Sequence, residues 1–276
     1  MRRMDRSGIV DHLRVKPKSK ADLAKTETGS TKGAPGDKKI TEAASAVLNE
    51  ELAGLQERLW AENSRSLLVV LQAIDAGGKD GAIRKVFGGV NPQGCRVTSF
   101  KAPSDEELSH DFLWRVHQNT PRKGEIGIFN RSHYEDVLVV RVHDLVPKKV
   151  WSKRYSIIND FEAGLAAAGT TVVKFFLHIS KEEQAERFRK RLENPEKHWK
   201  FRRGDLEERK NWDEYQEAFE DAITKTSTAA APWYVIPADH KWYRDWALLS
   251  VLVETLRTMD PQYPAPEEDL AGIVIE

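Results

Sequence analysis

The sequence has almost no cysteine, no long apolar run and no net charge, and each shortage excludes a class of protein. Cys95 is its one cysteine, which excludes an internal disulfide and argues against a thiolate zinc cluster. No stretch approaches the roughly 18 to 20 apolar residues that cross a bilayer, and the N-terminus lacks an apolar signal core. Because 43 basic and 43 acidic residues cancel, the overall charge points to neither nucleic acid nor membrane. We therefore expect a soluble, cytoplasmic protein without nucleic-acid or membrane partners.

Positive charge is concentrated near the N-terminus. Residues 1–40 carry 11 Lys and Arg against 5 Asp and Glu, and they are polar and rich in glycine. Such a segment has little to bury, so we expect an arm that is either disordered or wrapped over the body. Residues 41–276 show no internal repeat and are expected to form a single domain.

Helical and strand patterns alternate after residue 40. Apolar residues recur at helical spacing over residues 41–63 and again over residues 242–256. Five apolar runs predict strands at residues 67–74, 96–101, 125–130, 171–179 and 233–237. This alternation predicts an α/β fold, in which helices cover both faces of a parallel sheet.

The first predicted strand leads into a glycine-rich loop, LVVLQAIDAGGKDG over residues 68–81. A phosphate loop needs a positioning strand, glycines that let successive N–H groups point inward, and the electropositive start of a helix. Gly77, Gly78 and Gly81 supply the turn, and residues 80–87 supply the helix. Lys79 can then reach a transferred phosphate.

The loop departs from the usual G-x-x-x-x-G-K-[ST] pattern in two places. Ala73 stands where the first glycine belongs, and Asp80 stands where a hydroxyl residue would bind magnesium. Asp75 adds a second carboxylate, and two carboxylates beside a polyanion require a metal between them or a role as a base. A plain glycine-rich turn with a surface lysine is the alternative.

A second polar motif follows the strand at 125–130. Asn130, Arg131 and Ser132 stand at the carboxyl end of that strand, where α/β proteins bind ligands. Glu135 and Asp136 come about one helical turn later. The alternative is that Asn130 caps a helix while Arg131 pairs with Glu135.

Residues 187–203 are basic, with 8 Lys and Arg against 2 acids, and residues 205–221 invert this with 8 acids against 2 basic residues. Pro195 interrupts the basic part, so we expect a kinase-like lid at about residues 187–222 that closes over phosphate. The alternative is a solvated helical hairpin whose halves attract each other.

Together these motifs resemble the second family of polyphosphate kinases. That family carries a D-[AG]-[AG]-G-K-D-G loop, matched by residues 75–81, and an F-N-R-S-x-Y motif, matched by residues 129–134. The similarity extends through residues 178–184, 199–201 and 205–209, although the Arg-Arg-Gly at 202–204 departs from the family pattern and leaves the lid geometry open. The resemblance implies a thymidylate kinase-like P-loop fold with a helical lid. The sequence that follows the second motif, through residue 137, resembles the branch that accepts both AMP and ADP.

The resemblance also implies the chemistry. It implies reversible phosphoryl transfer between inorganic polyphosphate and nucleotides, from AMP or ADP to ADP or ATP, with Mg²⁺ or Mn²⁺, in a homodimer or homotetramer. Catalytic roles would fall to Asp75, Lys79, Asp80, Arg131 and Asp136, of which the three aspartates would hold the metal. Phosphate or nucleotide contacts would fall to Ala76, Gly77, Gly78, Gly81, Asn130, Ser132, Tyr134 and Glu135. Polyphosphate would follow Arg84, Lys85, Lys200, Arg202, Arg203 and Arg209.

Two other functions stay open on the sequence. One is an ATP-dependent nucleoside monophosphate kinase of the same fold, which would work without polyphosphate. The other is a non-catalytic nucleotide or polyanion sensor that binds through the basic arm.

Overall fold

A computed structural model describes residues 7–266, 268 and 273–275. Residues 1–6 of the expected arm lie outside the described residues, as do residues 267, 269–272 and 276 of the expected domain.

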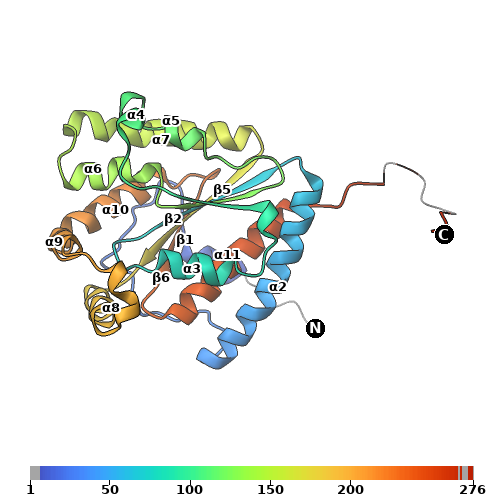
Figure 1. Ribbon diagram of the computed structural model, residues 1–276, viewed down its shortest axis with the longest axis horizontal. Coiled ribbons are helices and arrows are strands. Elements are labelled where there is room, and N and C mark those ends of the chain that lie inside the picture. The colour runs from blue at the N-terminus through green and yellow to red at the C-terminus, as the bar shows by residue number, and fades with distance from the viewer. Residues whose placement is uncertain (1–6, 267, 269–272, 276) are drawn as a thin grey trace.

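A six-stranded sheet forms the centre of the molecule (Figure 1). Its order is β1-β6-β5-β2-β4-β3, and every neighbouring pair is parallel except β1 with β6. The strands are β1 Arg14–Val15, β2 Ser66–Gln72, β3 Cys95–Ser99, β4 Ile126–Asn130, β5 Thr170–His178 and β6 Trp233–Pro237. The predicted α/β fold is therefore confirmed, and each of the five predicted strands lies within two residues of its observed ends. Sequence reasoning missed β1, because a strand of two residues has no periodicity to detect.

Helices cover both faces of this sheet, with α7 and α10 on one side and α2, α3 and α11 on the other (Figure 1). The helices are α1 Ser7–Leu13, α2 Lys38–Glu62, α3 Lys79–Val86, α4 Asp105–Ser109, α5 Trp114–His117, α6 Val139–Val142, α7 Lys148–Ala167, α8 Lys181–Glu193, α9 Gly204–Glu208, α10 Trp212–Thr226 and α11 Lys241–Met259. Short 3₁₀ turns are η1 Pro92–Gly94, η2 His133–Val137, η3 Pro195–Lys200 and η4 Arg209–Asn211. Every residue of β2 is buried, as expected for a central strand that is covered on both faces.

The described part of the N-terminal segment packs against the body. The backbone N–H of Ala21 donates to Thr224 on α10 at 2.9 Å, and the ring of His178 bonds the carbonyl of Leu23 at 3.1 Å. The hydroxyl of Tyr243 on α11 donates to the carbonyl of Lys32 at 2.7 Å. These contacts favour the wrapped alternative for the segment, while the division of the chain at residue 40 stays a prediction.

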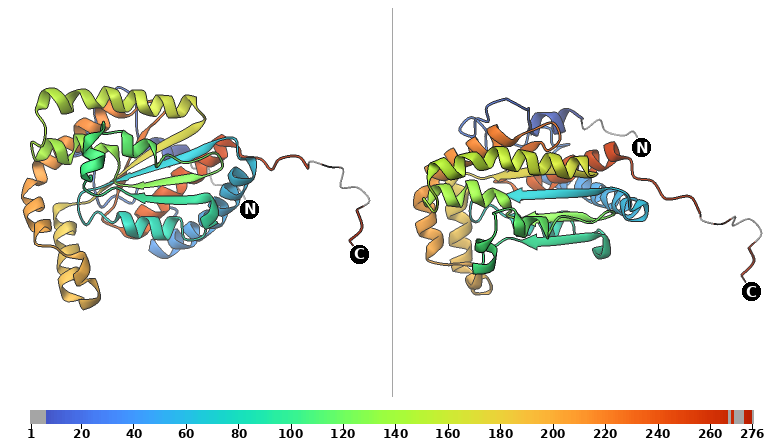
Figure 2. Two further views of the ribbon diagram at one scale, coloured as in Figure 1. Left: turned by 45° about the horizontal axis from the view of Figure 1, so that its top comes forward. Right: turned by 90° about the horizontal axis from the view of Figure 1, so that it is seen from above.

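The expected lid region is a helical hairpin, made of α8, η3, α9, η4 and α10, at one end of the molecule (Figure 2). Ser180 begins it by accepting a hydrogen bond from the N–H of Glu183, and Asn194 begins η3 in the same way from Glu196. At its tip the side chain of Trp199 is 76% exposed. Within the described part of the chain, none of the helices is both long enough and apolar enough to cross a membrane.

Candidate active site

The loop between β2 and α3 depends on two glycines. The N–H of Gly77 donates to the carbonyl of Ile74 at 2.9 Å, which closes a tight turn. A Cβ at Gly77 would lie 2.4 Å from the Cβ of Ala73 and 2.8 Å from the oxygen of Ile74, so no larger residue fits without moving the turn. Gly78 has φ of 97°, in the left-handed region that glycine adopts without strain. The loop therefore places its backbone at the start of α3, where an anion is stabilised.

Lys79 is the first residue of α3, and its side chain is only 9% exposed. Its ammonium donates to the carbonyl of Ala73 at 3.0 Å, back across the loop. Burial, aided by the positive charge of Arg131, lowers the pKa of Lys79 to about 8, while Asp75, Glu135 and Asp80 act in the opposite direction. A phosphate bound in the loop would offset the free-energy cost of burying the charged ammonium, because it would give that ammonium an anionic partner.

Arg131 joins the second motif to the loop. The strands β2 and β4 are neighbours, with Leu71 opposite Asn130, so the segments that follow them meet at the carboxyl edge of the sheet. One nitrogen of Arg131 donates to the carboxylate of Asp75 at 2.5 Å, and another donates to Glu135 at 3.5 Å. The amide of Asn130 donates to Asp80 at 2.7 Å. The two motifs thus form one site that contains both cations and carboxylates.

The backbone of Arg131 is strained. Its φ of 63° lies in the left-handed region, which costs a bulky residue about 1 kcal/mol or more. The N–H of Arg131 donates to the carbonyl of Leu71 on β2, which holds this conformation. The strained turn lets the guanidinium reach the neighbouring loop.

Asp136 does not join the other two aspartates. Arg154 on α7 donates to its carboxylate at 2.9 Å and to its carbonyl at 3.0 Å. Burial raises the pKa of Asp136 to about 6, and the nearby Arg154 and Arg115 only partly counteract it. Among the described residues, no three His, Cys, Asp or Glu side chains gather where they could hold a metal. The expected set of three carboxylate ligands is therefore not assembled, because Arg154 holds Asp136; Asp75 and Asp80 remain together beside Lys79.

The side chains of η2 alternate between the site and the interior. With its amide turned so that the nitrogen faces Glu135, Gln72 accepts from the N–H of Ser132 at 3.2 Å and donates to the carboxylate of Glu135 at 3.0 Å, so Glu135 is held beside the loop. Tyr134, in contrast, is fully buried, and its hydroxyl donates to Glu162 at 2.9 Å. The hydroxyl of Tyr134 is therefore directed into the interior, and the expected contact of this residue with a nucleotide stays a prediction.

Tyr134 instead belongs to a buried polar cluster. Lys174 on β5 donates to the hydroxyl of Tyr134 at 2.9 Å and also pairs with Glu162 on α7. The ring of His133 lies 3.3 Å from the same carboxylate, and burial lowers its pKa. By holding His133 and Tyr134, this cluster fixes the position of η2. It thereby also orients Arg131 and Glu135, which face the loop.

Two arginines that sequence reasoning did not assign hold the loop from its other side. Arg187 on α8 is 7% exposed and donates to the carbonyl of Ala76 at 2.9 Å. Arg244 on α11 is 3% exposed and donates to the carbonyl of Gly78 at 3.3 Å. Gln184 adds a bond of 2.9 Å to the carbonyl of Asp75. The sequence contained a signal for Arg244, because it lies among the apolar residues of the predicted C-terminal helix. A buried charge at such a position needs a specific partner.

The residues expected to bind polyphosphate lie in three places. Arg84 and Lys85 are exposed in the last turn of α3. Lys200, Arg202 and Arg203 are exposed in the hairpin. Arg209 is instead anchored at the base of the hairpin, donating to Gln184 at 2.7 Å.

A family comparison decides the identity of this site. A family model described as polyphosphate kinase 2 matches residues 36–264, which include both motifs and the hairpin. The chain belongs to the polyphosphate kinase 2 family.

Relatives and solved structures agree with this assignment. A relative from Meiothermus ruber named AMP/ADP-polyphosphate phosphotransferase is 59% identical over 263 residues, which cover 95% of this chain and 98% of that protein. An ADP-polyphosphate phosphotransferase from Rhodopseudomonas palustris is 49% identical over 78% of each chain. The crystal structure of polyphosphate kinase 2 from Arthrobacter aurescens TC1 superposes with a TM-score of 0.92 at 45% identity, covering 95% of this chain and 94% of that one. The family resemblance of the two motifs and the kinase fold are thus confirmed, whereas the roles of individual residues stay predictions.

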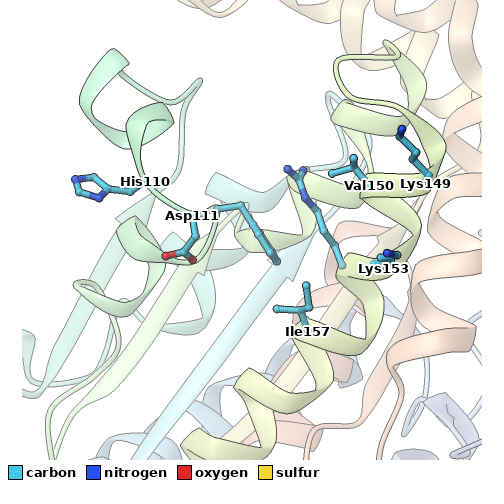
Figure 3. A pocket seen from close by; sticks show the side chains of 8 residues that line it. His110, Asp111, Lys149, Val150, Lys153 and Ile157 are labelled. Carbon is cyan, nitrogen blue, oxygen red and sulfur yellow. The ribbon is translucent and has the colours of Figure 1, made fainter.

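This polyphosphate kinase also has a pocket beside the second motif (Figure 3). Its volume is about 500 Å³, and Arg154, which pairs with Asp136, forms part of its wall. The wall combines apolar and charged side chains from the segment after α4 and from α7: His110, Asp111, Phe112, Lys149, Val150, Lys153, Arg154 and Ile157. A volume in this range suits a small organic ligand.

Proposed function

We propose that this polyphosphate kinase transfers a phosphoryl group between inorganic polyphosphate and adenine nucleotides, with both AMP and ADP as acceptors. The observation that carries this proposal is the pair of cations at the loop. Lys79, at the start of α3, and Arg131, directly after β4, both lie beside Asp75 of the loop. Phosphoryl transfer asks a protein mainly for position and for stabilisation of charge, and this arrangement supplies both.

Each cation has a distinct task in this proposal. Lys79 binds the transferred phosphoryl group together with the loop amides, because among the described residues its buried ammonium donates to a neutral partner alone, the carbonyl of Ala73. Arg131 stabilises charge in the transition state, which a comparable arginine does by roughly three to five powers of ten in rate. The pairing of Arg131 with Asp75 keeps the guanidinium at the loop before substrate arrives.

The proposed reaction depends on Mg²⁺, which Mn²⁺ can replace. The donor set fits such a metal, because Asp75 and Asp80 offer hard oxygen ligands and each accepts its hydrogen bond from the second motif through Oδ1. Mg²⁺ commonly binds one or two carboxylates and completes its shell with phosphate and water. Bound there, it would neutralise charge on the phosphates. The surrounding residues bind and orient the substrates without it.

We place the nucleoside of the acceptor in the pocket beside α7. Its apolar residues Phe112, Val150 and Ile157 suit a base, and the cations beside them suit the phosphates. Arg154 connects this pocket to Asp136 and hence to the second motif. We also propose a homodimer or homotetramer, supported by the exposed apolar side chains Ile40 and Val47 on α2, and a location in the cytoplasm, supported by the free thiol of Cys95.

The test is a coupled ATP assay with Mg²⁺ and long-chain polyphosphate, in which AMP and ADP are offered separately. ATP from both acceptors, lost in Lys79→Ala and retained in Lys123→Ala, is the expected result. Lys123 is a matched control, because it is exposed beside the start of β4, at the opposite edge of the sheet.

ATP formation from ADP alone would overturn the proposed acceptor range. Activity that needs ATP as donor and ignores polyphosphate would instead identify a nucleoside monophosphate kinase, and no turnover at all would favour a sensor. Removal of the metal with EDTA should abolish turnover, and added Mg²⁺ or Mn²⁺ should restore it.

A further inference from the structure

The buried polar cluster beside η2 contains an ion pair that the proposed reaction does not use directly. Glu162 on α7 is 1% exposed, and Lys174 on β5 is 0% exposed. Among the described residues, they hydrogen-bond to each other and to His133, Tyr134 and Thr226. Both charges therefore lie in the interior, closed to any substrate that binds at the loop.

Lys174 uses all three N–H donors of its ammonium. It donates to the hydroxyl of Tyr134 at 2.9 Å and to the carbonyl of Thr226 at 2.7 Å, and its third bond goes to Glu162. Lys174 stands opposite Val70 on β2, the strand that leads into the loop. The ammonium thus ties η2 to the strand beside the one that carries the loop.

Glu162 holds the first two residues of η2. Its carboxylate accepts from the hydroxyl of Tyr134 at 2.9 Å, and the ring of His133 lies 3.3 Å from the same oxygen. Burial alone would raise the pKa of the Glu162 carboxyl, but the charge of Lys174 and the bond from His133 outweigh burial and lower it. The carboxylate is therefore ionised, and an ionised acceptor makes stronger hydrogen bonds than a neutral one.

Such a pair contributes position more than stability. Taking two charges out of water costs free energy that their attraction recovers only in part, so apolar side chains of similar volume often stabilise a fold equally well or better. The neighbouring Arg131, in contrast, has a φ of 63°, and such a conformation persists only where the surrounding contacts enforce it. Leu71 accepts from the N–H of Arg131 on one side, and the anchored His133 and Tyr134 hold the chain on the other.

We propose that Glu162 and Lys174 are positioning residues for phosphoryl transfer, which hold η2 so that the guanidinium of Arg131 faces the loop. This inference rests on the proposed function, because it acts through the task assigned there to Arg131. The pair should affect kcat rather than substrate binding, because Arg131 acts in the transition state. A displacement of about 1 Å at such a group can cost about a hundredfold in rate.

The test replaces both charges at once, Glu162→Leu together with Lys174→Met, so that no unpaired charge remains in the interior. The hydroxyl of Tyr134 keeps the hydroxyl of Thr226 as a partner at 3.0 Å, so the double variant should melt within about 5 °C of the wild type. We expect kcat to fall about a hundredfold. The KM values for polyphosphate and for ADP should each change less than about twofold.

Two further variants separate the proposed role from a folding defect. Glu162→Asp keeps the charge and shortens the side chain by one methylene, so it should fold and still lower kcat at least about fivefold. The matched control is Glu51→Leu together with Arg257→Met, which removes an ion pair of 2.6 Å between α2 and α11. This control should leave kcat and both KM values unchanged.

A second measurement shows whether the pair acts through Arg131. In an Arg131→Ala background, replacing Glu162 and Lys174 should lower kcat by less than about threefold, because the group that the replacement displaces is already absent.

The outcomes separate this inference from the proposed function. A folded double variant or a Glu162→Asp protein with the kcat of the wild type would overturn the positioning role and leave the function standing. An equal fall of kcat with and without Arg131, or a rise of either KM at unchanged kcat, would also overturn it. A wild type without polyphosphate-dependent turnover would overturn the proposed function itself, before any variant is compared.

Discussion

Replacing Lys79 by methionine should abolish turnover and yet stabilise the ligand-free protein. The buried ammonium has a pKa of about 8 in the folded protein against 10.5 for an unperturbed lysine. At 1.36 kcal/mol for each pKa unit, this difference destabilises the folded protein by about 3 kcal/mol. Methionine removes that cost and keeps the aliphatic packing, but it loses the bond to Ala73, which contributes about 1 kcal/mol. The net gain at pH 7 is therefore about 2 kcal/mol.

The pH dependence of this gain has a defined sign. The pKa of Lys79 is lower in the folded state, so the unfolded chain binds more protons between pH 8 and pH 10.5. The destabilisation is complete below pH 8 and disappears as the pH rises to 10.5. The stability difference between Lys79→Met and the wild type should therefore shrink across that window.

Urea unfolding of both proteins without ligand, at several pH values from 7 to 10, measures this difference. At pH 7 the variant should also melt roughly 4 to 8 °C higher than the wild type. The ATP assay on the same samples should show a loss of at least about two powers of ten in kcat. Lys85→Met, an exposed lysine of the same helix, is the stability control and should show no gain. A Lys79→Met protein that is less stable than the wild type at pH 7, or a gain that does not depend on pH, would refute the reasoning.

Three further predictions follow from the site. The pKa of Asp136 is raised to about 6, and its proposed role requires the ionised carboxylate, so kcat/KM should fall as the pH drops through 6. Asp136→Asn should remove that acid limb from the pH profile. Gly77→Ala should lower turnover more than about a hundredfold and cost about 1 to 3 kcal/mol of stability, because its Cβ would clash with Ala73 in the turn. Gly89→Ala is the control, because open space surrounds Gly89, and it should affect neither kcat nor melting temperature. Tyr134→Phe should cost about 1 to 3 kcal/mol, measured by urea unfolding, because Lys174 and Glu162 each lose one hydrogen bond inside the buried cluster, while the KM for AMP stays unchanged. A selective rise of that KM would restore Tyr134 as a ligand contact.

Much of the fold could be predicted from the sequence because its signals are local. The strands β2 and β5 are nearly continuous apolar runs, and α10 and α11 carry apolar stripes at helical spacing. The positions of Lys79 and Arg131 followed from similar local logic, since Lys79 ends the loop that follows β2 and Arg131 comes directly after β4. Strand order then brought them together, because β2 and β4 are neighbours with their carboxyl ends at one edge.

The rest of the site depends on tertiary contacts that leave no local pattern. Asp136 lies one residue from Glu135, yet Arg154 on α7 holds it elsewhere. Tyr134 looks like a ligand contact in the motif, but its direction is decided by Lys174, which lies 40 residues away in the sequence. Arg244 contacts a loop residue 166 positions away, and no spacing rule reaches so far.

These long sequence separations also set the order in which the chain can become functional. The carbonyls of Asp75, Ala76 and Gly78 are held by side chains 109, 111 and 166 residues later in the chain. Contacts between such distant residues form late in folding, because closing the intervening chain costs entropy before the contact returns any stability. During synthesis, β2 and the loop leave the ribosome well before α11 does. The loop therefore acquires its finished shape only when nearly the whole chain has been made, so a nascent or C-terminally truncated chain exposes the phosphate-binding sequence without the conformation that binds.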